Sequence, residues 1–513
     1  MKPDKIVTLA ELKDHIIPVC QRDGESVVLC HGHYNIIHPG HMRFIEHAKS
    51  LGNKLIVAVY GDCHFSESER KRIYPQLVRA QGLSALHMVD YVLILDSHTL
   101  LDTLVSIKPA IFVMGKDYEQ ERNAEEVEAS RFANSSGIKV VYHSGEIHYA
   151  SSELLHSSQK ELEQARLHQF IESCKRQQVN IVDMSHYLGK FSNLRLLVIG
   201  DTIVDQYAAC EPLGMSAEAP VLVVRELETK EYVGGAGIVA THVRALGAEC
   251  YYLSIVGHDH PAEMVRNEME KLQINAHLIE DSSRPTTFKI RYMVDNQKLF
   301  RVSRLQDHSP SQELESQLIE RLEELVPQVD GVLVSDYVYG MVTNRLLTRL
   351  LELARKHSVK LFGDLQCSSQ IGNISRFKEF DLICPTEREA RIALGDNESG
   401  LEWIAQTLRD KTKSDELLIK MGGDGFIAYT NENGSGFLGR QHFPALAVNP
   451  VDVTGAGDSL LAAMSVSICA GASLMEASAI GACMASIAVQ TVGNIPVSSE
   501  KLQTLLHSMS SKF

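Results

Sequence analysis

Residues 449–464 read NPVDVTGAGDSLLAAM, in which two glycines separate a short apolar run from a run of helical composition. The glycines allow a tight turn whose backbone N–H groups point outward, and the following helix adds the partial positive charge of its N-terminus. We therefore predict that Gly455, Ala456 and Gly457 hold a phosphate that gains negative charge, and that Asp458 accepts a proton from an attacking hydroxyl. A glycine N-cap with an aspartate in the first helical turn would explain GAGD alone equally well.

The bulk composition limits the class of protein. A chain of 513 residues is too long to fold around a single hydrophobic core, and its length predicts roughly two to four domains. The formal net charge of −15 argues against nucleic acid and anionic membrane as general partners. The ten cysteines include no C-x-x-C pair, which favours reduced thiols. The sequence has no signal-peptide core and no run of about 18 apolar residues, so we expect a soluble, cytoplasmic protein.

Strands alternate with helices in the first 157 residues. Apolar strand patterns cover residues 26–30, 54–60, 90–95, 110–115 and 139–144, and helical patterns cover residues 5–19, 42–52 and 76–87. This order predicts an α/β domain with a doubly wound parallel sheet, in which ligands bind beyond the carboxyl ends of the strands. The segment HGHYNIIHPGH, residues 31–41, lies at such an end, directly after the first strand.

The four histidines of that segment raise the question of a metal site. The segment has neither an H-x-x-x-H spacing on a helix nor a nearby pair of carboxylates, so we predict no metal there. A phosphate site fits better, because His38 and His41 flank Pro39-Gly40 at the start of a helix whose N-terminus can face the same phosphates. A histidine-rich surface loop is the plain alternative.

HPGH, with a strand before it and a helix after it, resembles the H-x-G-H motif of the cytidylyltransferase-like nucleotidyltransferases. Residues 74–92, 115–118 (GKDY) and 150–152 (ASS) resemble further segments of that family. The resemblance implies that His38 and His41 act on the nucleotide phosphates, and that further residues bind the nucleotide: Gly32, Arg79 near the triphosphate, Lys116, Ser151 and Ser152. A helix N-cap is an alternative role for the two serines. Asn35 replaces an acid of the family, and Lys116 lies one place later than its usual lysine.

The first domain, residues 1–157, is followed by a connector. Residues 153–192 contain no glycine or proline before Gly189, and their charged and apolar residues alternate at helical spacing. We therefore predict a stiff helical connector over residues 158–192 and a second domain over residues 193–513.

Two acids follow the first strand of the second domain. LRLLVIGD, residues 194–201, is a buried-strand pattern that ends in Asp201, and Asp205 comes four residues later. These carboxylates could accept hydrogen bonds from sugar hydroxyls, and the later pair Gly234-Gly235 would let backbone approach the same ligand. An aspartate that caps the next turn is about as good an explanation of the first acid alone.

The full DVTGAGD string resembles the signature of the ribokinase-like (PfkB) sugar kinases, and the resemblance extends over residues 194–500. It implies a second doubly wound α/β domain with Asp458 as catalytic base, Gly455–Gly457 as anion hole, and the acids and glycines above at the sugar. It also implies nucleotide-binding residues, namely Gly422, Gly423 and Gly425 in a turn and Asn494 beside adenine. Alternating strands over residues 219–235 and 286–302 would form a small β-lid, through which we expect a homodimer.

Within that family the second domain is most similar to heptose-7-phosphate kinases, through segments such as SAEAPVLVV, RPTTFKIR and VSDYVYG. With its first domain the chain resembles the bifunctional heptose-7-phosphate kinase/heptose-1-phosphate adenylyltransferases of lipopolysaccharide precursor synthesis, in reversed domain order. The implied activity is phosphorylation of a sugar phosphate at the anomeric position by ATP with Mg²⁺. Nucleotidyl transfer from ATP, or CTP, with release of pyrophosphate would follow. The expected partners are a sugar phosphate and a nucleoside triphosphate, with no nucleic acid and no membrane.

The second domain departs from the heptose kinases at substrate-facing positions. Gly214 replaces an arginine, Ile238 an asparagine, Tyr339 and Gln366 lysines, and Thr386 an asparagine. The loss of three cations that could hold a substrate phosphate leaves a different sugar or polyol phosphate open as the substrate. A non-catalytic module that senses a sugar or nucleotide is the alternative from another class.

Overall fold

The computed structural model describes residues 5–35, 37, 39–65, 70, 73–115, 124–143, 159–181, 183–216, 218, 221–294, 297–367, 370–431 and 438–510. The chain forms two units, Met1–Ser158 with Asp396–Ile404 and Gln159–Gly395 with Ala405–Phe513. Four residues with predicted roles, His38, Lys116, Ser151 and Ser152, lie outside the described residues.

A parallel sheet in the order β1-β4-β3-β2-β5-β6 organises the first unit. Its strands are β1 (Ile6–Val7), β2 (Val27–Gly32), β3 (Lys54–Tyr60), β4 (Tyr91–Leu95), β5 (Ile111–Gly115) and β6 (Lys139–His143). Strands β2 and β3 are nearly continuous apolar runs, as expected for strands buried on both faces. The direction of winding reverses between β2 and β5, so the segment after β2 lies where sheets of this class bind ligands.

Helices cover both faces of this sheet. They are α1 (Leu9–Glu11), η1 (Leu12–Ile16), α2 (Ile17–Arg22), α3 (Pro39–Ser50), η2 (Asp62–His64), α5 (Gln76–Ser84), α6 (Leu100–Ile107) and α8 (Ala124–Ser135). The helix predicted over residues 5–19 is correct only from Leu9 onward. Thr8 and Glu11 form a capping box that starts the helix there, and Ile6 and Val7 instead pair with β4 as an edge strand.

A larger sheet, in the order β11-β10-β7-β14-β15-β16-β17-β18-β19, forms the body of the second unit. Its strands are β7 (Arg195–Gly200), β10 (Glu249–Val256), β11 (Asn275–Glu280), β14 (Gly331–Asp336), β15 (Lys360–Leu365), β16 (Leu382–Ile383), β17 (Glu416–Lys420), β18 (Phe426–Asn431) and β19 (Leu438–Phe443). The pairs from β11 to β17 are parallel, and β18 and β19 add antiparallel pairs. The segments that follow β7, β14 and β15 therefore share one edge of the sheet.

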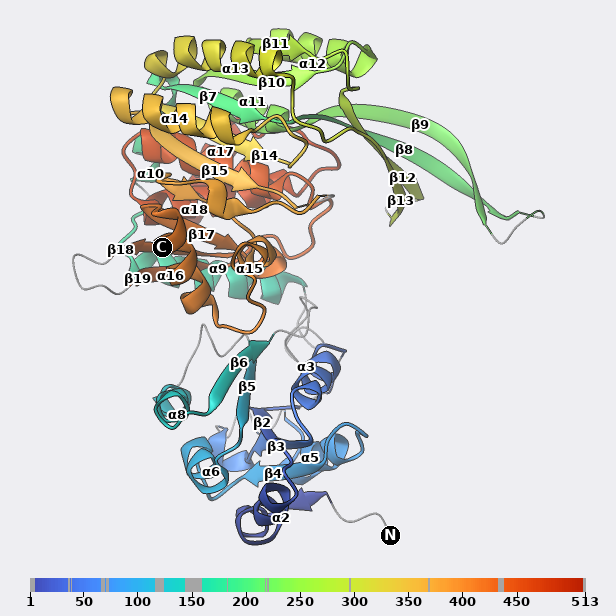
Figure 1. Cartoon of the computed structure of the whole chain (residues 1–513), viewed down its shortest axis with the longest axis vertical. Coiled ribbons are helices and arrows are strands. Elements are labelled where there is room, and N and C mark those ends of the chain that lie inside the picture. The colour runs from blue at the N-terminus through green and yellow to red at the C-terminus, as the bar shows by residue number, and fades with distance from the viewer. Residues whose placement is uncertain are drawn as a thin grey trace. The chain divides into compact units, whose positions relative to one another are not determined.

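Helices pack on both faces of the larger sheet (Figure 1). They are α11 (Ala236–Ala245), α12 (His260–Lys271), α13 (Gln312–Leu325), α14 (Asn344–His357), α15 (Glu387–Leu394), α16 (Leu401–Thr412), α17 (Ala456–Cys469), α18 (Leu474–Ala488) and α19 (Ser499–Ser510), with the short turns η3 (Phe191–Asn193), η4 (Val326–Gln328), η5 (Ile374–Arg376) and η6 (Gly422–Asp424). Helix α17 is buried along nearly its whole length. Among the described residues, no helix is both long and apolar enough to span a membrane.

A second, smaller sheet in the order β13-β12-β8-β9 forms what we call the lid sheet. Its strands are β8 (Thr202–Met215), β9 (Leu222–Gly235), β12 (Thr287–Val294) and β13 (Gln297–Arg304). Figure 1 shows β8 and β9 extending well beyond the helices of the second unit. The lid sheet exposes several large apolar side chains: Leu213, Leu222, Val223, Leu227, Phe300 and Val302. The predicted fold, two doubly wound α/β domains with a small β-lid, is confirmed.

The predicted connector is helical, and its helices belong to the second unit. They are α9 (Gln159–Arg176) and α10 (Met184–Leu188). Phe170, Cys174 and Met184 lie in the same apolar core as the main sheet of that unit. Arg166 Nη1 donates to the carbonyl oxygens of Ala445 at 2.8 Å and Ala447 at 2.7 Å, which ties α9 to the segment after β19. These helices are therefore a structural layer of the second unit.

Candidate active site

The predicted phosphate turn forms the N-terminus of α17. Gly455 is the N-cap residue, with φ +80° and ψ 0°, in the left-handed region that favours glycine. A Cβ atom at Gly455 would also lie 2.9 Å from Asn494 Oδ1. Asp458 lies in the first turn of the helix and is only 5% exposed. The sequence-predicted turn and carboxylate therefore sit together at the positive end of a buried helix.

Two side chains from neighbouring strand ends hold the Asp458 carboxylate. The hydroxyl of Tyr337, just after β14, donates to Oδ1 at 3.0 Å and Oδ2 at 3.1 Å. Gln366, just after β15, donates from Nε2 to Oδ1 at 2.9 Å. Burial, and then the negative charge of Asp364, raises the pKa of Asp458 to about 7. A carboxylate that titrates near neutral pH is well matched to accepting a proton from a hydroxyl.

A buried ion pair lies beside the same turn. Lys420 Nζ donates to both carboxylate oxygens of Asp364 at 2.7 Å. A Cβ atom at Gly457 would lie 3.4 Å from Lys420 Nζ, so the absence of a side chain at Gly457 lets the turn approach this cation. Burial raises the pKa of Asp364, and the charge of Lys420 opposes that rise. The turn that would hold a phosphate is thus bordered by a fixed positive charge.

The two acids predicted to bind sugar are buried at the base of the lid sheet. Asp201 accepts hydrogen bonds from the backbone N–H groups of Tyr337 at 2.8 Å, Tyr339 at 3.4 Å and Met341 at 3.3 Å. Asp205 accepts from Arg291 Nη1 at 2.5 Å and from Asn494 Nδ2 at 2.9 Å. Burial raises the pKa of Asp201. Both carboxylates therefore already organise protein donors around the site.

The predicted glycines and Asn494 lie against these acids. A Cβ atom at Gly234 would meet Asp205 Oδ2 at 2.4 Å. Gly235 has φ +60°, and a Cβ atom there would meet the carbonyl oxygen of Asp201 at 2.3 Å. The structure thus brings the four residues predicted at the sugar together. It also places Asn494 with them, between Asp205 and Gly455, whereas the sequence predicts Asn494 beside adenine.

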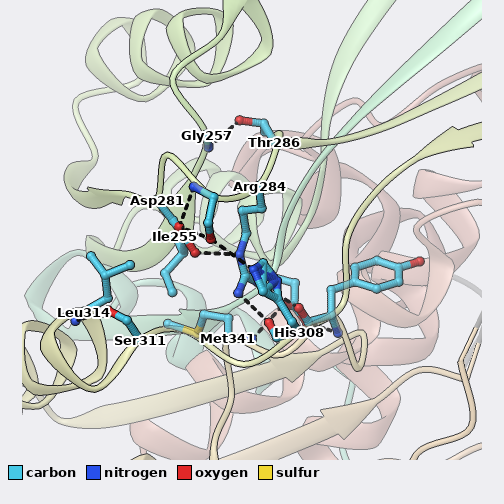
Figure 2. Close-up of polar contacts among 12 residues, drawn as sticks. Ile255, Gly257, Asp281, Arg284, Thr286, His308, Ser311, Leu314 and Met341 are labelled. Carbon is cyan, nitrogen blue, oxygen red and sulfur yellow. Dashed lines mark hydrogen bonds and ion pairs between the residues drawn. The ribbon is translucent and has the colours of Figure 1, made fainter.

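An arginine that the sequence analysis missed fixes the loop over Asp201. Arg284 Nε donates to Asp281 Oδ2 at 2.7 Å, and Nη1 donates to the carbonyl oxygen of Tyr339 at 3.0 Å. The same guanidinium also donates to the carbonyl oxygen of His308. Figure 2 shows Arg284, Asp281 and His308 converging on one point. Arg284 stands in the quoted segment RPTTFKIR, which is the only sequence signal for it.

The lid sheet is bonded to the DVTGAGD segment through Asp452. Tyr207 on β8 donates its hydroxyl to Asp452 Oδ2 at 2.6 Å, and Lys298 on β13 donates to Oδ1 at 3.0 Å. Burial alone would raise the pKa of Asp452, but the hydrogen bonds from Tyr207, Thr454 and Lys298 lower it to about 2. The ionised carboxylate of Asp452 therefore links the lid strands to the segment that contains the predicted phosphate turn.

The positions that depart from the heptose kinases have defined surroundings. Gln366 bonds the Asp458 carboxylate, and Thr386 forms a capping box with Glu389 at the start of α15. Ile238 and Tyr339 are buried, whereas Gly214 is exposed in β8 near a break in the strand register. Where the heptose kinases have three cations, this chain has a hydrogen-bond donor to the Asp458 carboxylate at Gln366, a buried ring at Tyr339 and an exposed strand glycine at Gly214.

The glycine turn predicted to line a nucleotide site consists of η6 and the next residue, Gly425. Gly425 has φ +93°, and a Cβ atom there would lie 2.1 Å from the carbonyl oxygen of Phe443, so the β18–β19 packing itself requires glycine. Gly422 has φ +62°, and both Gly422 and Gly423 are exposed. A contact with nucleotide stays a prediction for all three.

In the first unit, the described motif residues gather at the end of β2. Tyr34 has φ +47°, and its ring folds back so closely that a Cβ atom at Gly32 would lie 2.9 Å from it. His41, in the first turn of α3, has its ring centroid 5.1 Å from that of Tyr34. Asn35 Oδ1 accepts from the Tyr74 backbone N–H at 2.8 Å. Among the described residues, no three His, Cys, Asp or Glu side chains are grouped as metal ligands would be.

Arg79 is held by intramolecular hydrogen bonds, and its predicted contact with a triphosphate stays a prediction. Its guanidinium is fully buried and donates to the carbonyl oxygens of Tyr74 at 2.8 Å, His33 at 2.8 Å and Tyr60 at 2.7 Å. Nη2 also donates to Asp62 Oδ1 at 2.8 Å. Arg79 therefore fastens the loop after β2 to the segments around α5.

Comparison with curated proteins finds relatives named "Bifunctional protein HldE". The chain is 30% identical to that of Desulfatibacillum aliphaticivorans over 322 residues, which are 62% of this chain and 64% of the relative. It is 29% identical to that of Bradyrhizobium diazoefficiens over 329 residues, 63% of this chain and 65% of the relative. The chain thus spans less than two thirds of the length of these relatives.

Comparison with solved structures finds sugar kinases. Phosphofructokinase-2 from Escherichia coli, in complex with substrates and products, superposes with a TM-score of 0.52 at 17% identity, covering 62% of this chain and 99% of that one. Ribokinase from Giardia lamblia gives a TM-score of 0.51 at 14% identity, with 62% of this chain and 99% of that one covered. At such identities the likeness shows the fold alone.

Two family models match the chain in the predicted order. Residues 29–158 match the family described as cytidylyltransferase-like, and residues 193–501 match the pfkB family of carbohydrate kinases. The second match covers more than half of the chain and contains the turn, the carboxylate and the lid strands described above. The chain therefore belongs to the pfkB family of carbohydrate kinases and carries a cytidylyltransferase-like domain in its N-terminal part.

Proposed function

We propose that the second unit phosphorylates a sugar phosphate at its anomeric hydroxyl with ATP, and that the first unit transfers a nucleotidyl group to the resulting sugar 1-phosphate. The observation that supports the kinase activity best is the buried Asp458 at the N-terminus of α17, held by Tyr337 and Gln366. The resemblance of the chain to bifunctional heptose enzymes favours heptose 7-phosphate as acceptor. It also favours ATP, with CTP as the alternative, in the second reaction.

In the kinase reaction, Asp458 takes the proton from the anomeric hydroxyl, whose oxygen forms a bond to the γ-phosphorus of ATP while the bond to ADP breaks. The N–H groups of Gly455–Gly457 and the nearby Lys420 stabilise the charge on the transferring group. Asp201 and Asp205 orient the sugar from the base of the lid sheet.

Mg²⁺ fits the donors at this edge of the sheet. Asp364 and Glu389 are buried carboxylates, and the charge of Glu389 helps to raise the pKa of Asp364 after burial itself. Lys420 already offsets part of this negative charge, and a divalent cation would offset more of it. Mg²⁺ is commonly held by one or two carboxylates together with nucleotide phosphates. Asp364 and Glu389 would hold it, and it would supply neutralisation of the phosphate charge.

In the first unit, the oxygen of the sugar 1-phosphate would attack the α-phosphorus of the nucleoside triphosphate, and pyrophosphate would leave. His41, in the first turn of α3, and His38, three residues earlier in the sequence, would neutralise the charge that develops there, with Lys116, Ser151 and Ser152 as further contacts. The helix N-terminus at the switch point of the sheet supports this site. No protein nucleophile is required.

The Asp458→Asn variant tests the assignment. It should abolish formation of ADP from ATP and sugar phosphate and leave pyrophosphate release from an added sugar 1-phosphate unchanged. A substrate screen of the wild type and the variant identifies the substrates. It combines ATP or CTP with heptose 7-phosphate and with other sugar and polyol phosphates, and it measures ADP and pyrophosphate separately. Kinase activity retained by Asp458→Asn would refute the role of Asp458, and the absence of both products with every substrate would favour a sensing module.

Two further expectations belong to the same proposal. The exposed apolar side chains of the lid sheet, such as Leu222, Leu227 and Phe300, support a homodimer formed through the lid. Sedimentation of the wild-type chain and of a Leu227→Glu variant would test it, because the charge should favour the monomer. We also place the enzyme in the cytoplasm, where its nucleotide substrates are.

A further inference from the structure

A strained turn follows β14, at the edge of the sheet where the proposed kinase site lies. Val338, two residues beyond the end of β14, has φ +62°, in the left-handed region. Among the described residues, Val338 is the only β-branched residue with a positive φ. Branching at Cβ makes this conformation costly, and such residues persist only where the surrounding structure holds them in place. The contacts that hold the turn, and the group that it positions, therefore indicate its role.

Two carboxylates hold the turn through its backbone N–H groups. Asp336 is 1% exposed, and its Oδ1 atom accepts a hydrogen bond from the N–H of Val338 at 2.8 Å. Asp201 accepts hydrogen bonds from the N–H of Tyr337 at 2.8 Å and from that of Tyr339 at 3.4 Å. Three successive N–H groups are thus bound by two buried acids.

This arrangement is costly in charge as well as in strain. Asp336 and Asp201 lie at the ends of neighbouring strands, since Ser335 of β14 pairs with Gly200 of β7. Burial, and then the negative charge of Asp201, raises the pKa of Asp336, and the charge of Arg376 opposes that rise. Arg376 Nη1 donates to Asp336 Oδ2 at 3.3 Å. A loop that only connected two elements would need neither the strain nor the paired acids, which points to a role beyond connection.

The side chain that the turn positions is that of Tyr337. Its hydroxyl donates to both oxygens of the Asp458 carboxylate, at 3.0 and 3.1 Å. Its ring stacks on that of Tyr339 with the centroids 6.4 Å apart, and Lys289 Nζ lies 5.3 Å from its centroid. A displacement of about 1 Å at a reacting group can lower a rate by about 100-fold. The conformation of the turn therefore bears on the orientation of the proposed base.

We propose that Asp336 is a positioning residue of the kinase reaction: by holding the N–H of Val338, it keeps the Tyr337 hydroxyl on the base. This inference rests on the proposed kinase function and adds a residue that acts on Asp458 through Tyr337. Gln366 contacts Asp458 from a different strand end, so the carboxylate keeps one donor when the turn is disturbed. Loss of Asp336 should therefore slow phosphoryl transfer and leave binding of the sugar phosphate largely unchanged.

Steady-state kinetics of full-length variants test the inference, with kcat and KM measured separately from ADP formation with the best sugar phosphate of the screen. An assay at about pH 9 keeps Asp458 ionised, because its pKa is about 7. Asp336→Ala removes the acceptor of the Val338 N–H. It should lower kcat by about 10- to 100-fold, the usual effect of losing a hydrogen bond to a charged group, and change KM by less than about threefold.

A double-variant cycle distinguishes positioning through Tyr337 from a general loss of structure. Tyr337→Phe removes the hydroxyl and should lower kcat to about the same extent. Once the hydroxyl is gone, Asp336→Ala should lower kcat by less than about a further threefold, because residues that act through one another are not additive. Effects that multiply in the double variant would overturn the inference. If Asp336→Ala does not fold, Asp336→Ser replaces it in the cycle, because a neutral hydroxyl is a weaker acceptor.

Val338→Gly provides a second test, because glycine adopts a positive φ without being held there. In the Val338→Gly background, loss of Asp336 should lower kcat by less than about threefold. Asp381→Ala is the matched control. Asp381 Oδ2 accepts a hydrogen bond from the N–H of Leu361 at 2.7 Å, at the opposite ends of the strands, so kcat should stay at the wild-type value.

The outcomes separate the inference from the function on which it rests. A wild-type kcat in the Asp336 variant, a change confined to KM, or an equal fall of kcat in Asp381→Ala would overturn the role of Asp336. ADP formation by the wild type would in that case leave the proposed kinase function standing. A wild type that forms no ADP with any sugar or polyol phosphate would refute the kinase function and the inference together.

Discussion

Replacing Gln366 by lysine should shift the pH dependence of sugar phosphorylation toward acid. In the proposed reaction Asp458 must lose its proton to act as a base, and its pKa of about 7 should then set the acidic limb of kcat/KM. Gln366 Nε2 lies 2.9 Å from Asp458 Oδ1, so a lysine ammonium there would face the carboxylate directly. A positive charge so placed favours the ionised form of the carboxylate.

The size of the shift follows from that distance. Two opposite charges about 4 Å apart interact with about 4 kcal/mol at an effective dielectric constant of about 20, and nearby cations lower carboxyl pKa values by about 1–3 units. The acidic limb should therefore move from about 7 to between about 4 and 6. Gln366→Met, which removes the donor without adding charge, should move the limb in the opposite direction, above 7.

The assay is kcat/KM for formation of ADP, measured from about pH 4.5 to 9 with the best sugar phosphate of the screen. Pyrophosphate release from sugar 1-phosphate serves as internal control, because Gln366 belongs to the second unit. Acidic limbs that coincide in the wild type and both variants would refute the reasoning, since Asp458 could not then be the group that limits the rate at low pH.

Three further predictions concern stability. Because the folded-state pKa of Asp458 is raised, the stability contributed by its protonated form is lost as pH rises through about 7. Asp458→Asn should therefore raise the free energy of unfolding at pH 8 by up to about 4 kcal/mol, and by much less at pH 4. Urea denaturation at the two pH values measures both changes. Gly455→Ala should cost about 1–3 kcal/mol and most of the kinase activity, because of its positive φ and the close approach of Asn494; wild-type unfolding curves would contradict this. Arg79→Lys should lower the melting temperature of the first unit, because one ammonium cannot replace four guanidinium bonds; a loss of nucleotide affinity at unchanged stability would instead support the predicted triphosphate contact.

Local patterns in the sequence were sufficient to predict the strands, the glycine turn and the place of Asp458 in the first turn of the helix that follows, since each depends on residues close together in the chain. Their roles in binding and catalysis stay predictions. The surroundings of Asp458 were not predictable in this way. Gln366 is 92 residues from Asp458 in sequence, and only the sheet order brings the ends of β14 and β15 to α17. From the sequence, Gln366 is only a position at which the heptose kinases have a lysine, and nothing predicts its hydrogen bond to Asp458.

The contacts of Arg79 and Asn494 were also not predictable from the sequence. A resemblance assigns each a ligand, but the carbonyl oxygens around Arg79 and the Asp205 carboxylate beside Asn494 are set by tertiary packing. The start of the first helix, by contrast, is encoded locally: Thr8 followed three residues later by Glu11 is a capping-box pattern, which predicts a helix that begins at Leu9.

The packing of α9 and α10 determines where the two proposed activities can be separated in the laboratory. A fragment that begins at residue 193, where the family match starts, would lose Phe170, Cys174 and Met184 and leave their cavities open in the core of the second unit. A fragment that begins before Gln159 keeps those side chains and the Arg166 contacts with the segment after β19. Expression of the kinase on its own should therefore start upstream of α9.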